Sequence, residues 1–318
     1  MSQQLQLVRS GSFVDALASC FTRMPQADFL GFFDTIEGPS PHQIALLERD
    51  RFPEALCHDM EWNRVQFLAS TPMVPAKLMF DLPIAIHKLG RTIRNPLVDC
   101  FPCQNMSAML TAPGPISRAQ DRCLWSGIRA PLQNLHTVAF QQPLDHAQYR
   151  LPPPALGKAY PHLKLFSRAI FSGPDLERVY VYMDAPEKMM ILRNQGKLTV
   201  APLLDGLQWK HIKVFSLAYA ALTESQLIKW LAPLGPILEV MFFEYIHLRA
   251  GTWGLILDRL RELVDQAKQH HEMIPRVYLR MLREAEMNEG SHIKIRANLY
   301  VRGQSDQGNP CKLYHSVN

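Results

Sequence analysis

The sequence lacks a long apolar run and a recognisable secretory signal. Its most apolar stretch, from Pro236 to Leu248, is interrupted by Glu239, Glu244 and His247. A membrane-spanning helix needs about 18 uninterrupted apolar residues, so we expect no membrane segment. At the N-terminus no basic segment precedes an apolar one, which is the pattern of a signal peptide. These absences predict a cytoplasmic or nuclear protein.

A strong excess of positive charge is also missing. The net charge is +5 over 318 residues. The most basic region, residues 276–302, is interrupted by Glu284, Glu286 and Glu289. Proteins that bind the phosphate backbone present a concentrated basic face. We therefore expect no nucleic-acid partner.

Cysteines are few and irregularly spaced, with six in the chain. Cys100-Phe101-Pro102-Cys103 forms a C-x-x-C motif. A redox pair of this kind opens a helix after a strand, and a zinc site needs further ligands. Residues 93–99 do not read as a clear core strand, and no second pair follows. We expect reduced thiols, no cofactor and no metal; the alternative is a thiol-dependent redox or metal-binding protein that uses Cys100 and Cys103.

Motifs that would indicate catalysis are likewise missing. The sequence has no G-x-S-x-G, no phosphate-binding G-x-x-x-x-G-K-[ST] and no G-x-G-x-x-G after a strand. His270 and His271 are adjacent, so they point to different faces of a helix, whereas helical zinc ligands are four residues apart. We predict that the protein is not an enzyme.

A short strand motif of the form L-x-x-L-x-L recurs along the chain. One copy places apolar residues at Ile212, Phe215 and Leu217, and the next copy begins at Leu238. The two copies start 26 residues apart, within the period of about 20–29 residues that leucine-rich repeats have. Looser copies are Ala27/Leu30/Phe32, Leu135/Val138/Phe140 and Leu176/Val179/Val181. The repeats are therefore irregular, with insertions.

Helical patterns lie between these strands. Ser12, a favourable N-cap residue, is predicted to begin a helix with apolar residues at four-residue spacing. Thr223 begins a second amphipathic segment, and residues 252–268 form a third. Residues 76–89 also read as a helix, with a boundary or kink at Pro83. Alternating apolar residues from Ile293 to Val301 predict a final capping strand.

A strand and a helix that each expose one apolar face become stable when successive units stack. The predicted fold is therefore α/β: an irregular leucine-rich-repeat-like solenoid, or horseshoe, with parallel strands and outer helices. It spans residues 1–302 as one domain, with inserted loops near 34–74 and 141–161. Residues 303–318 are predicted to be a flexible C-terminal tail.

Three features together resemble the repeat region of filamentous-fungal F-box-type proteins. They are the opening segment 12–25, the strand register itself, and the sequence Leu248-Arg249-Ala250-Gly251-Thr252-Trp253. The resemblance implies repeats that bind the substrate of a ubiquitin ligase, while an F-box binds a Skp-type adaptor. Residues 1–12 are too few for an F-box, so we expect a Skp-type adaptor as a partner only if an F-box exists outside this chain.

In a horseshoe, the variable positions of the motif face the concave side, where partners bind. Arginine and aromatic side chains contribute disproportionately to binding. These criteria predict a concave binding face for an unknown protein partner, made by Arg178, Tyr180, Tyr182, Lys213, Phe242 and Glu244. The alternative is that the aromatic residues pack against the inserted loop at 141–161. The predicted function is a non-enzymatic interaction scaffold, in the narrower form the substrate-binding region of an F-box-type receptor.

Overall fold

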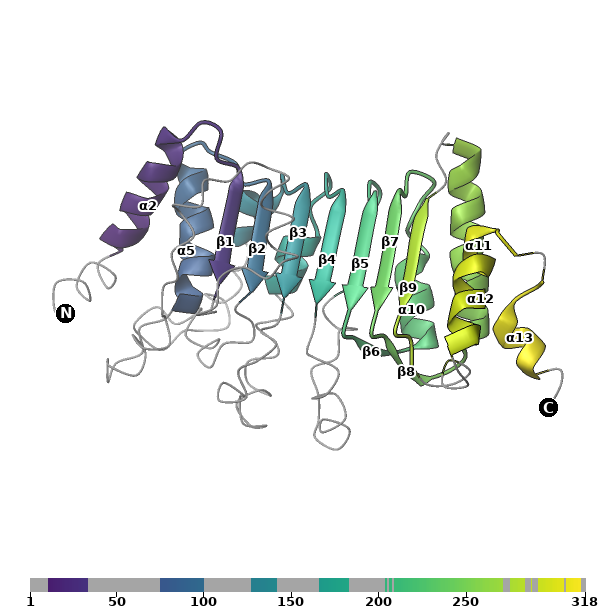
Figure 1. Cartoon of the computed structure of the whole chain (residues 1–318). Helices are drawn as coiled ribbons and strands as arrows, with labels where there is room; N and C mark the ends of the chain where they lie inside the picture. The colour runs from purple at the N-terminus through teal and green to yellow at the C-terminus, as the bar shows by residue number, and fades with distance from the viewer. Residues whose placement is uncertain are drawn as a thin grey trace, which may run out of the picture. The chain divides into compact units, whose positions relative to one another are not determined.

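The computed structural model of the chain describes residues 11–33, 75–99, 127–141, 166–182, 204, 206, 207, 209–270, 275–283, 287, 291–305 and 307–315 (Figure 1). They belong to two compact units. Unit 1 comprises Met1–Pro131 with Gln141–His162, and unit 2 comprises Leu132–Phe140 with Leu163–Asn318. The two units are described separately below.

The fold is α/β, with a seven-stranded parallel sheet in the order β1-β2-β3-β4-β5-β7-β9 and a two-stranded sheet, β6-β8. The strands are β1 (Phe29–Phe33), β2 (Asn95–Asp99), β3 (Thr137–Gln141), β4 (Arg178–Tyr182), β5 (Val214–Ala218), β6 (Ala221–Thr223), β7 (Val240–Glu244), β8 (His247–Ala250) and β9 (Arg276–Arg280). The five predicted strand motifs overlap β1, β3, β4, β5 and β7. The predicted α/β class with parallel strands is confirmed.

In unit 1, helices α2 (Ser12–Arg23) and α5 (Pro75–Lys88) pack against each other, and β1 pairs with β2. Gly11, with φ 79°, occupies the N-cap position of α2, so the prediction that Ser12 caps this helix is wrong. Helix α5 continues through Pro83, and the predicted early boundary there does not occur. The Arg91 guanidinium donates to the carbonyl oxygens of Met24 (3.2 Å) and Pro25 (3.0 Å), which fixes the turn between α2 and β1.

Unit 2 repeats one backbone arrangement from strand to strand. The carbonyl oxygen just before a strand accepts two N–H groups from the start of the next strand. This occurs at His136 (2.8 and 2.9 Å), Glu177 (2.7 and 3.0 Å) and Lys213 (2.7 and 3.0 Å). The carbonyl of Glu239 accepts from Arg276 N at 2.8 Å, and Pro275 adds no second bond because proline has no N–H. The described strands of unit 2 are thus stacked by the same contact despite unequal spacing in sequence.

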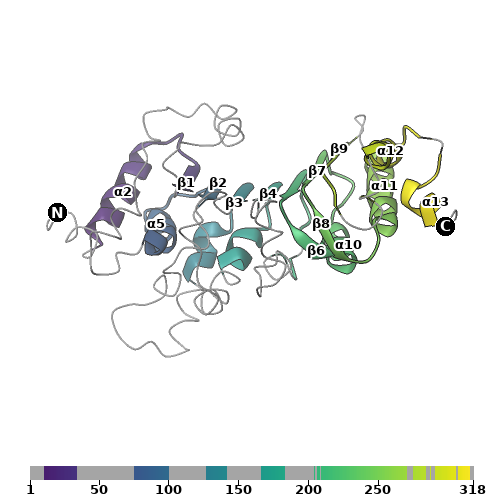
Figure 2. The ribbon, with the colours of Figure 1, turned by 60° about the horizontal axis from the view of Figure 1, so that its bottom comes forward.

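One face of the unit 2 strands forms the core. The inward residues are at most 5% exposed and comprise Val179, Val181, Phe215, Leu217, Met241, Phe243, Val277 and Leu279. The Phe215 ring lies 5.5 Å from the Trp209 ring and 5.9 Å from the Phe243 ring. Helix α10 (Glu224–Leu231) lies next to β6 and β8 and packs against α11 (Trp253–His270) (Figure 2). It buries Leu227, Trp230 and Leu231.

The pattern of buried apolar residues continues past the carboxyl ends of β5, β7 and β9. Ala220, Ile246 and Leu282 are 0%, 0% and 1% exposed, each three residues after the last core position of its strand. Leu222 and Leu248 follow at 1% and 3% exposure, in β6 and β8. The short parallel pair β6-β8 therefore extends the stacking past the main sheet.

The helices that follow β6 and β8 begin at adjacent points. Thr223 caps α10 with a reciprocal bond to Gln226, which confirms the predicted start of this helix. The Glu224 carboxylate accepts from the backbone N–H (2.7 Å) and hydroxyl (3.1 Å) of Thr252, just ahead of α11 (Trp253–His270). Gly251 has φ +95°, and a Cβ there would lie 2.3 Å from the Glu224 Cβ. Any other residue at position 251 would clash with Glu224, so glycine is required directly before Thr252 and Trp253.

The predicted final strand is wrong, because Ser291–Arg302 forms helix α12. Ile293, Ala297 and Val301, four residues apart, are 3%, 0% and 0% exposed, whereas Ile295 and Leu299 are 61% and 38% exposed. When apolar residues occupy every second position, every other one of them is four residues from the next. Only that series is buried, as a helix requires.

Helix α12 lies along the outer edge of β9. Asn298 Oδ1 accepts from Leu279 N (3.0 Å), and Asn298 Nδ2 donates to Leu279 O (2.8 Å). Arg302 donates from Nε and Nη2 to the carbonyl oxygen of Val277, at 2.9 and 2.7 Å. These side chains satisfy backbone groups that a further strand would otherwise pair with.

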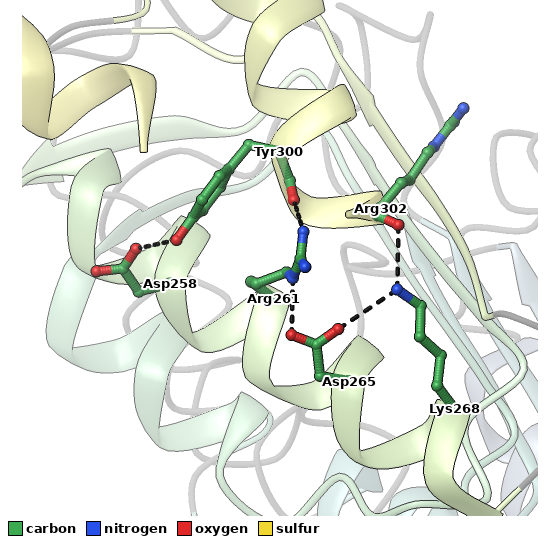
Figure 3. A network of polar contacts seen from close by, with 6 residues as sticks. All are labelled: Asp258, Arg261, Asp265, Lys268, Tyr300 and Arg302. Atoms are coloured by element: carbon green, nitrogen blue, oxygen red, sulfur yellow. Dashed lines mark hydrogen bonds and ion pairs between the residues drawn. The ribbon is translucent and has the colours of Figure 1, made fainter. Parts of the chain in front are cut away.

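A polar network joins α11 to the end of α12 (Figure 3). Arg261 donates to Asp265 (2.7 Å) and to the carbonyl oxygen of Tyr300 (2.6 Å), and Lys268 donates to the carbonyl oxygen of Arg302 (3.3 Å). Cationic side chains thus satisfy the last carbonyls of α12, where the helix dipole favours positive charge. Gly303, with φ +72°, ends the helix in a Schellman arrangement: its N–H donates to Tyr300 O, and Gln304 N donates to Leu299 O.

Part of the expected flexible tail forms a helix. Asn309 is 6% exposed and Cys311 is fully buried, and α13 (Pro310–His315) follows. Asp258 of α11 accepts from Tyr300 (2.8 Å), Asn309 (2.6 Å) and Lys312 (2.5 Å). Burial alone would raise the pKa of Asp258, but these donors outweigh burial and hold the pKa below its usual range. Burial and the bond to Asp258 raise the pKa of Tyr300 to about 12.

Candidate partner-binding face

The predicted site residues lie on strands of unit 2 that follow one another in the sheet. Strand β4 pairs with β5, β5 with β7 and β7 with β9, all in parallel register. The register aligns Tyr180, Ser216, Phe242 and Tyr278 in one row across the sheet. A second row contains Tyr182, Ala218, Glu244 and Arg280. Side chains alternate along a strand, so both rows lie on the face opposite the core residues.

The two tyrosines of β4 are not open to solvent. Tyr180 is 9% exposed and Tyr182 is 8% exposed, and the Tyr182 hydroxyl lies 3.3 Å from the Ser216 hydroxyl. Burial raises the pKa of Tyr182 above its usual range. Arg178, on the same strand, is half-buried. This part of the face is therefore covered within the chain.

Lys213 belongs to a different row, just ahead of β5. Its ammonium group donates to Glu177 at 2.8 Å, and the two side chains are 36% and 32% exposed. This bond lowers the pKa of Glu177. A pair that is this exposed contributes little stability, but it partly neutralises both charges.

Phe242 and Glu244 lie beside β9, a strand that none of the predicted strand motifs covers. The Phe242 and Tyr278 rings are 6.0 Å apart, and Arg280 Nη1 lies 4.0 Å from Glu244 Oε1. On β9 itself, Arg276, Tyr278 and Arg280 are exposed, whereas Val277 and Leu279 are buried. We call Val240, Phe242, Glu244, Arg276, Tyr278 and Arg280 the β7–β9 face. The alternation in Arg276-Val277-Tyr278-Leu279-Arg280 was the sequence signal that could have revealed it.

Arginine side chains lie over tyrosine rings beside this face. The Arg302 guanidinium is 5.5 Å from the centre of the Tyr278 ring, and that of Arg283 is 5.8 Å from the Tyr245 ring. Such cation–π contacts hold the positive charge in place while leaving part of the guanidinium edge available for hydrogen bonds.

The residue that follows each of the last three sheet strands has an unusual backbone conformation. Tyr219, Tyr245 and Met281 have φ values of 56°, 51° and 48°, which cost about 1 kcal/mol or more in a residue with a side chain. The N–H of Tyr219 donates to Glu244 O, and that of Tyr245 donates to Arg280 O. The Tyr219 and Tyr245 rings stack at 5.0 Å. The stacking and the repeated backbone bonds offset the strain and place an aromatic pair at the carboxyl end of the strands.

The proposed thiol pair cannot be placed. Cys100 and Cys103 lie outside the described residues, as does His271. The segment before Cys100 is strand β2, so the expectation of no strand there is wrong. Among the described residues no group of three or more His, Cys, Asp or Glu side chains is arranged to hold a metal ion. Nor does any helix within the described ranges have the length and apolarity to cross a membrane.

Comparison with known proteins identified no relative. No protein-family model, curated protein sequence or solved structure matches the chain.

Proposed function

We propose that this chain is a protein-interaction scaffold without enzymatic activity, and that the β7–β9 face contacts the partner. The observation that carries the proposal is the contrast between the two faces of β9. Val277 and Leu279 are 0% and 5% exposed, while Tyr278 is 37% exposed and the Arg280 side chain is 66% exposed. An exposed aromatic residue flanked by arginines, on a rigid sheet, has the composition of a binding surface.

We also propose that the fold is an irregular leucine-rich-repeat-like solenoid. Its support is the two-donor backbone contact repeated at His136, Glu177 and Lys213, together with the αL residues after β5, β7 and β9. Repeating units of this kind expose a continuous row of variable side chains that can be changed without disturbing the core.

Affinity purification with matched variants tests the scaffold function. The bait is the full chain, compared with Phe242→Ala combined with Tyr278→Ala and with Leu255→Ala, which is 51% exposed on α11. Proteins that wild type and Leu255→Ala both recover should be lost from the double variant. If the double variant recovers the same proteins in the same amounts, the β7–β9 face is not the binding surface. Tyr180 is unsuitable for this purpose, since its burial means that truncation would disturb packing.

The narrower proposal is that the partner is the substrate of an F-box-type ubiquitin ligase. Its support is the sequence resemblance around residues 12–25 and Leu248 to Trp253. Deleting the gene should then lengthen the half-lives of the proteins recovered through the β7–β9 face. Unchanged half-lives would contradict the ligase role while leaving the scaffold role intact.

A further inference from the structure

The β7–β9 face is basic around an aromatic centre. Arg276 and Arg280 flank Tyr278 at two-residue spacing on the same side of β9. Arg302 adds a third guanidinium, held over the Tyr278 ring by its two bonds to Val277 O. Two acidic residues lie close by: Glu244, whose side chain is 22% exposed, and Glu239, just before β7.

Neither acidic residue neutralises β9. The Arg280–Glu244 separation is 4.0 Å and the Arg280 side chain is 66% exposed, so this pair is a weak one. Arg276 is exposed, and no side-chain ion pair with it occurs in the described part of the chain. The surface therefore retains positive charge on both sides of Tyr278.

From this arrangement we infer that the β7–β9 face binds an extended acidic peptide, in which an apolar residue is flanked by carboxylates two positions away on each side. Same-face residues of a strand are about 6.6 Å apart, which places Arg276 and Arg280 roughly 13 Å apart. An extended peptide has the same spacing between alternate residues. It can thus place an apolar side chain against Phe242 and Tyr278 and a carboxylate on each arginine.

The side chains of the β7–β9 face favour an acidic peptide over other partners. Arginine binds a carboxylate through two parallel hydrogen bonds, and both Arg276 and Arg280 are exposed. Phe242 is partly exposed and Tyr278 is exposed, and their rings lie 6.0 Å apart, so an apolar group can contact both. A nucleic acid would need a longer basic track, and Glu239 and Glu244 interrupt one here.

The inference rests on the proposed scaffold function, and a peptide selection can separate the two. A phage-displayed library of random peptides is selected on the immobilised full chain, and the enriched peptides are titrated by fluorescence anisotropy. Enriched sequences should carry Asp or Glu on both sides of an apolar residue at two-residue spacing. Arg276→Glu combined with Arg280→Glu should weaken their binding at least about tenfold, and added salt should weaken it too.

The matched control is Arg249→Glu, which reverses an exposed arginine on β8 and should leave peptide binding unchanged. Both charge variants should melt at the wild-type temperature, because the residues are exposed.

Three results would overturn the inference. Peptides that lack carboxylates but depend on Phe242 and Tyr278 would refute the acidic partner while leaving the scaffold function standing. If no enriched peptide depends on any residue of the β7–β9 face, both the inference and the proposed site fail. Binding of a single-stranded oligonucleotide that is lost in the double charge variant, without enrichment of acidic peptides, would assign the face to nucleic acid.

Discussion

Asn298 of α12 pairs with Leu279 of β9 through both polar groups of its side-chain amide. Its oxygen accepts from Leu279 N at 3.0 Å, and its nitrogen donates to Leu279 O at 2.8 Å. The amide therefore mimics the backbone of one more strand. A parallel sheet leaves unpaired groups at its last strand, and such an edge readily pairs with other chains. Asn298 and Arg302 close this edge along α12.

Replacing Asn298 with alanine should open the edge. The backbone groups of Leu279 lose their partners, and the expected cost is about 1–3 kcal/mol in the free energy of unfolding. Hydrogen exchange of the Leu279 amide should accelerate, and the variant should self-associate at high concentration. Ile295→Ala, on the exposed side of the same helix, is the control and should show neither change. An unchanged exchange rate at Leu279 in Asn298→Ala would refute the edge-closing role.

Two glycines should not tolerate a side chain. Gly251→Ala places a Cβ 2.3 Å from the Glu224 Cβ at φ +95°, and Gly303→Ala places one 2.8 Å from Arg261 Nη1 and Lys268 Nζ at φ +72°. The left-handed conformation alone costs about 1–2 kcal/mol, and Gly251→Ala should cost more because a side-chain stem must move. Thermal unfolding measures both, with Gly308→Ala as control, since no atom lies within 4 Å of a Cβ there. Equal melting temperatures for all three variants would contradict this account.

The strand positions could be read from the sequence because core packing imposes a local pattern. Phe215 and Leu217, or Met241 and Phe243, alternate within one strand and need no distant information. Helix α12 was misassigned because Ile293, Ala297 and Val301 belong to both an alternating and a fourfold series. Only contact with α11 and β9 decides between the two. A helix within the predicted tail could not be read from the local sequence for a related reason: Asn309, just ahead of it, bonds to Asp258, about 50 residues away.

The site was predictable only in part. Phe242 and Glu244 follow from the strand register. Tyr278 and Arg280 were missed because the motif copy Ile274/Val277/Leu279, which has Pro275 directly after its first residue, was not among the predicted strands. The burial of Tyr180 and Tyr182 could not be read from β4 alone, since the alternation indicates a face and not what covers it. Whether the exposed residues contact a partner remains a prediction.

Stability should depend on the ionisation of Asp258. A carboxyl whose pKa is lowered by folding contributes stability above its unfolded pKa, and loses it as the pH falls through the folded pKa. Wild type should exceed Asp258→Asn by about 1–2 kcal/mol at pH 7, after allowance for partial exposure. The difference should shrink as the pH falls below the ordinary carboxyl pKa of 3.8 and vanish once the pH is below the lower pKa of the folded state. Urea unfolding at both pH values checks this, and a difference that does not change with pH would contradict it.

Two buried tryptophans should respond differently to the same substitution. Trp209 Nε1 donates to Phe171 O at 2.9 Å, whereas Trp230 Nε1, buried in α10, has no hydrogen-bond partner within the described part of the chain. The residues are 4% and 3% exposed, so replacement by phenylalanine removes a similar volume from each site. Trp209→Phe should therefore be about 1–2 kcal/mol more destabilising than Trp230→Phe, because it leaves the Phe171 carbonyl unpaired. Equal losses in urea unfolding would refute the proposed difference.

The central claim is that the β7–β9 face contacts a protein partner, and site-specific photo-crosslinking in cells tests it most directly. A photoreactive phenylalanine analogue replaces Tyr278, which is 37% exposed, in one variant and Leu255 on α11, which is 51% exposed, in the other. The account predicts a defined crosslinked protein from position 278 that Arg276→Glu combined with Arg280→Glu abolishes, and none from position 255. Crosslinking from position 255 alone, or equal yields of the same protein from both positions, would contradict it.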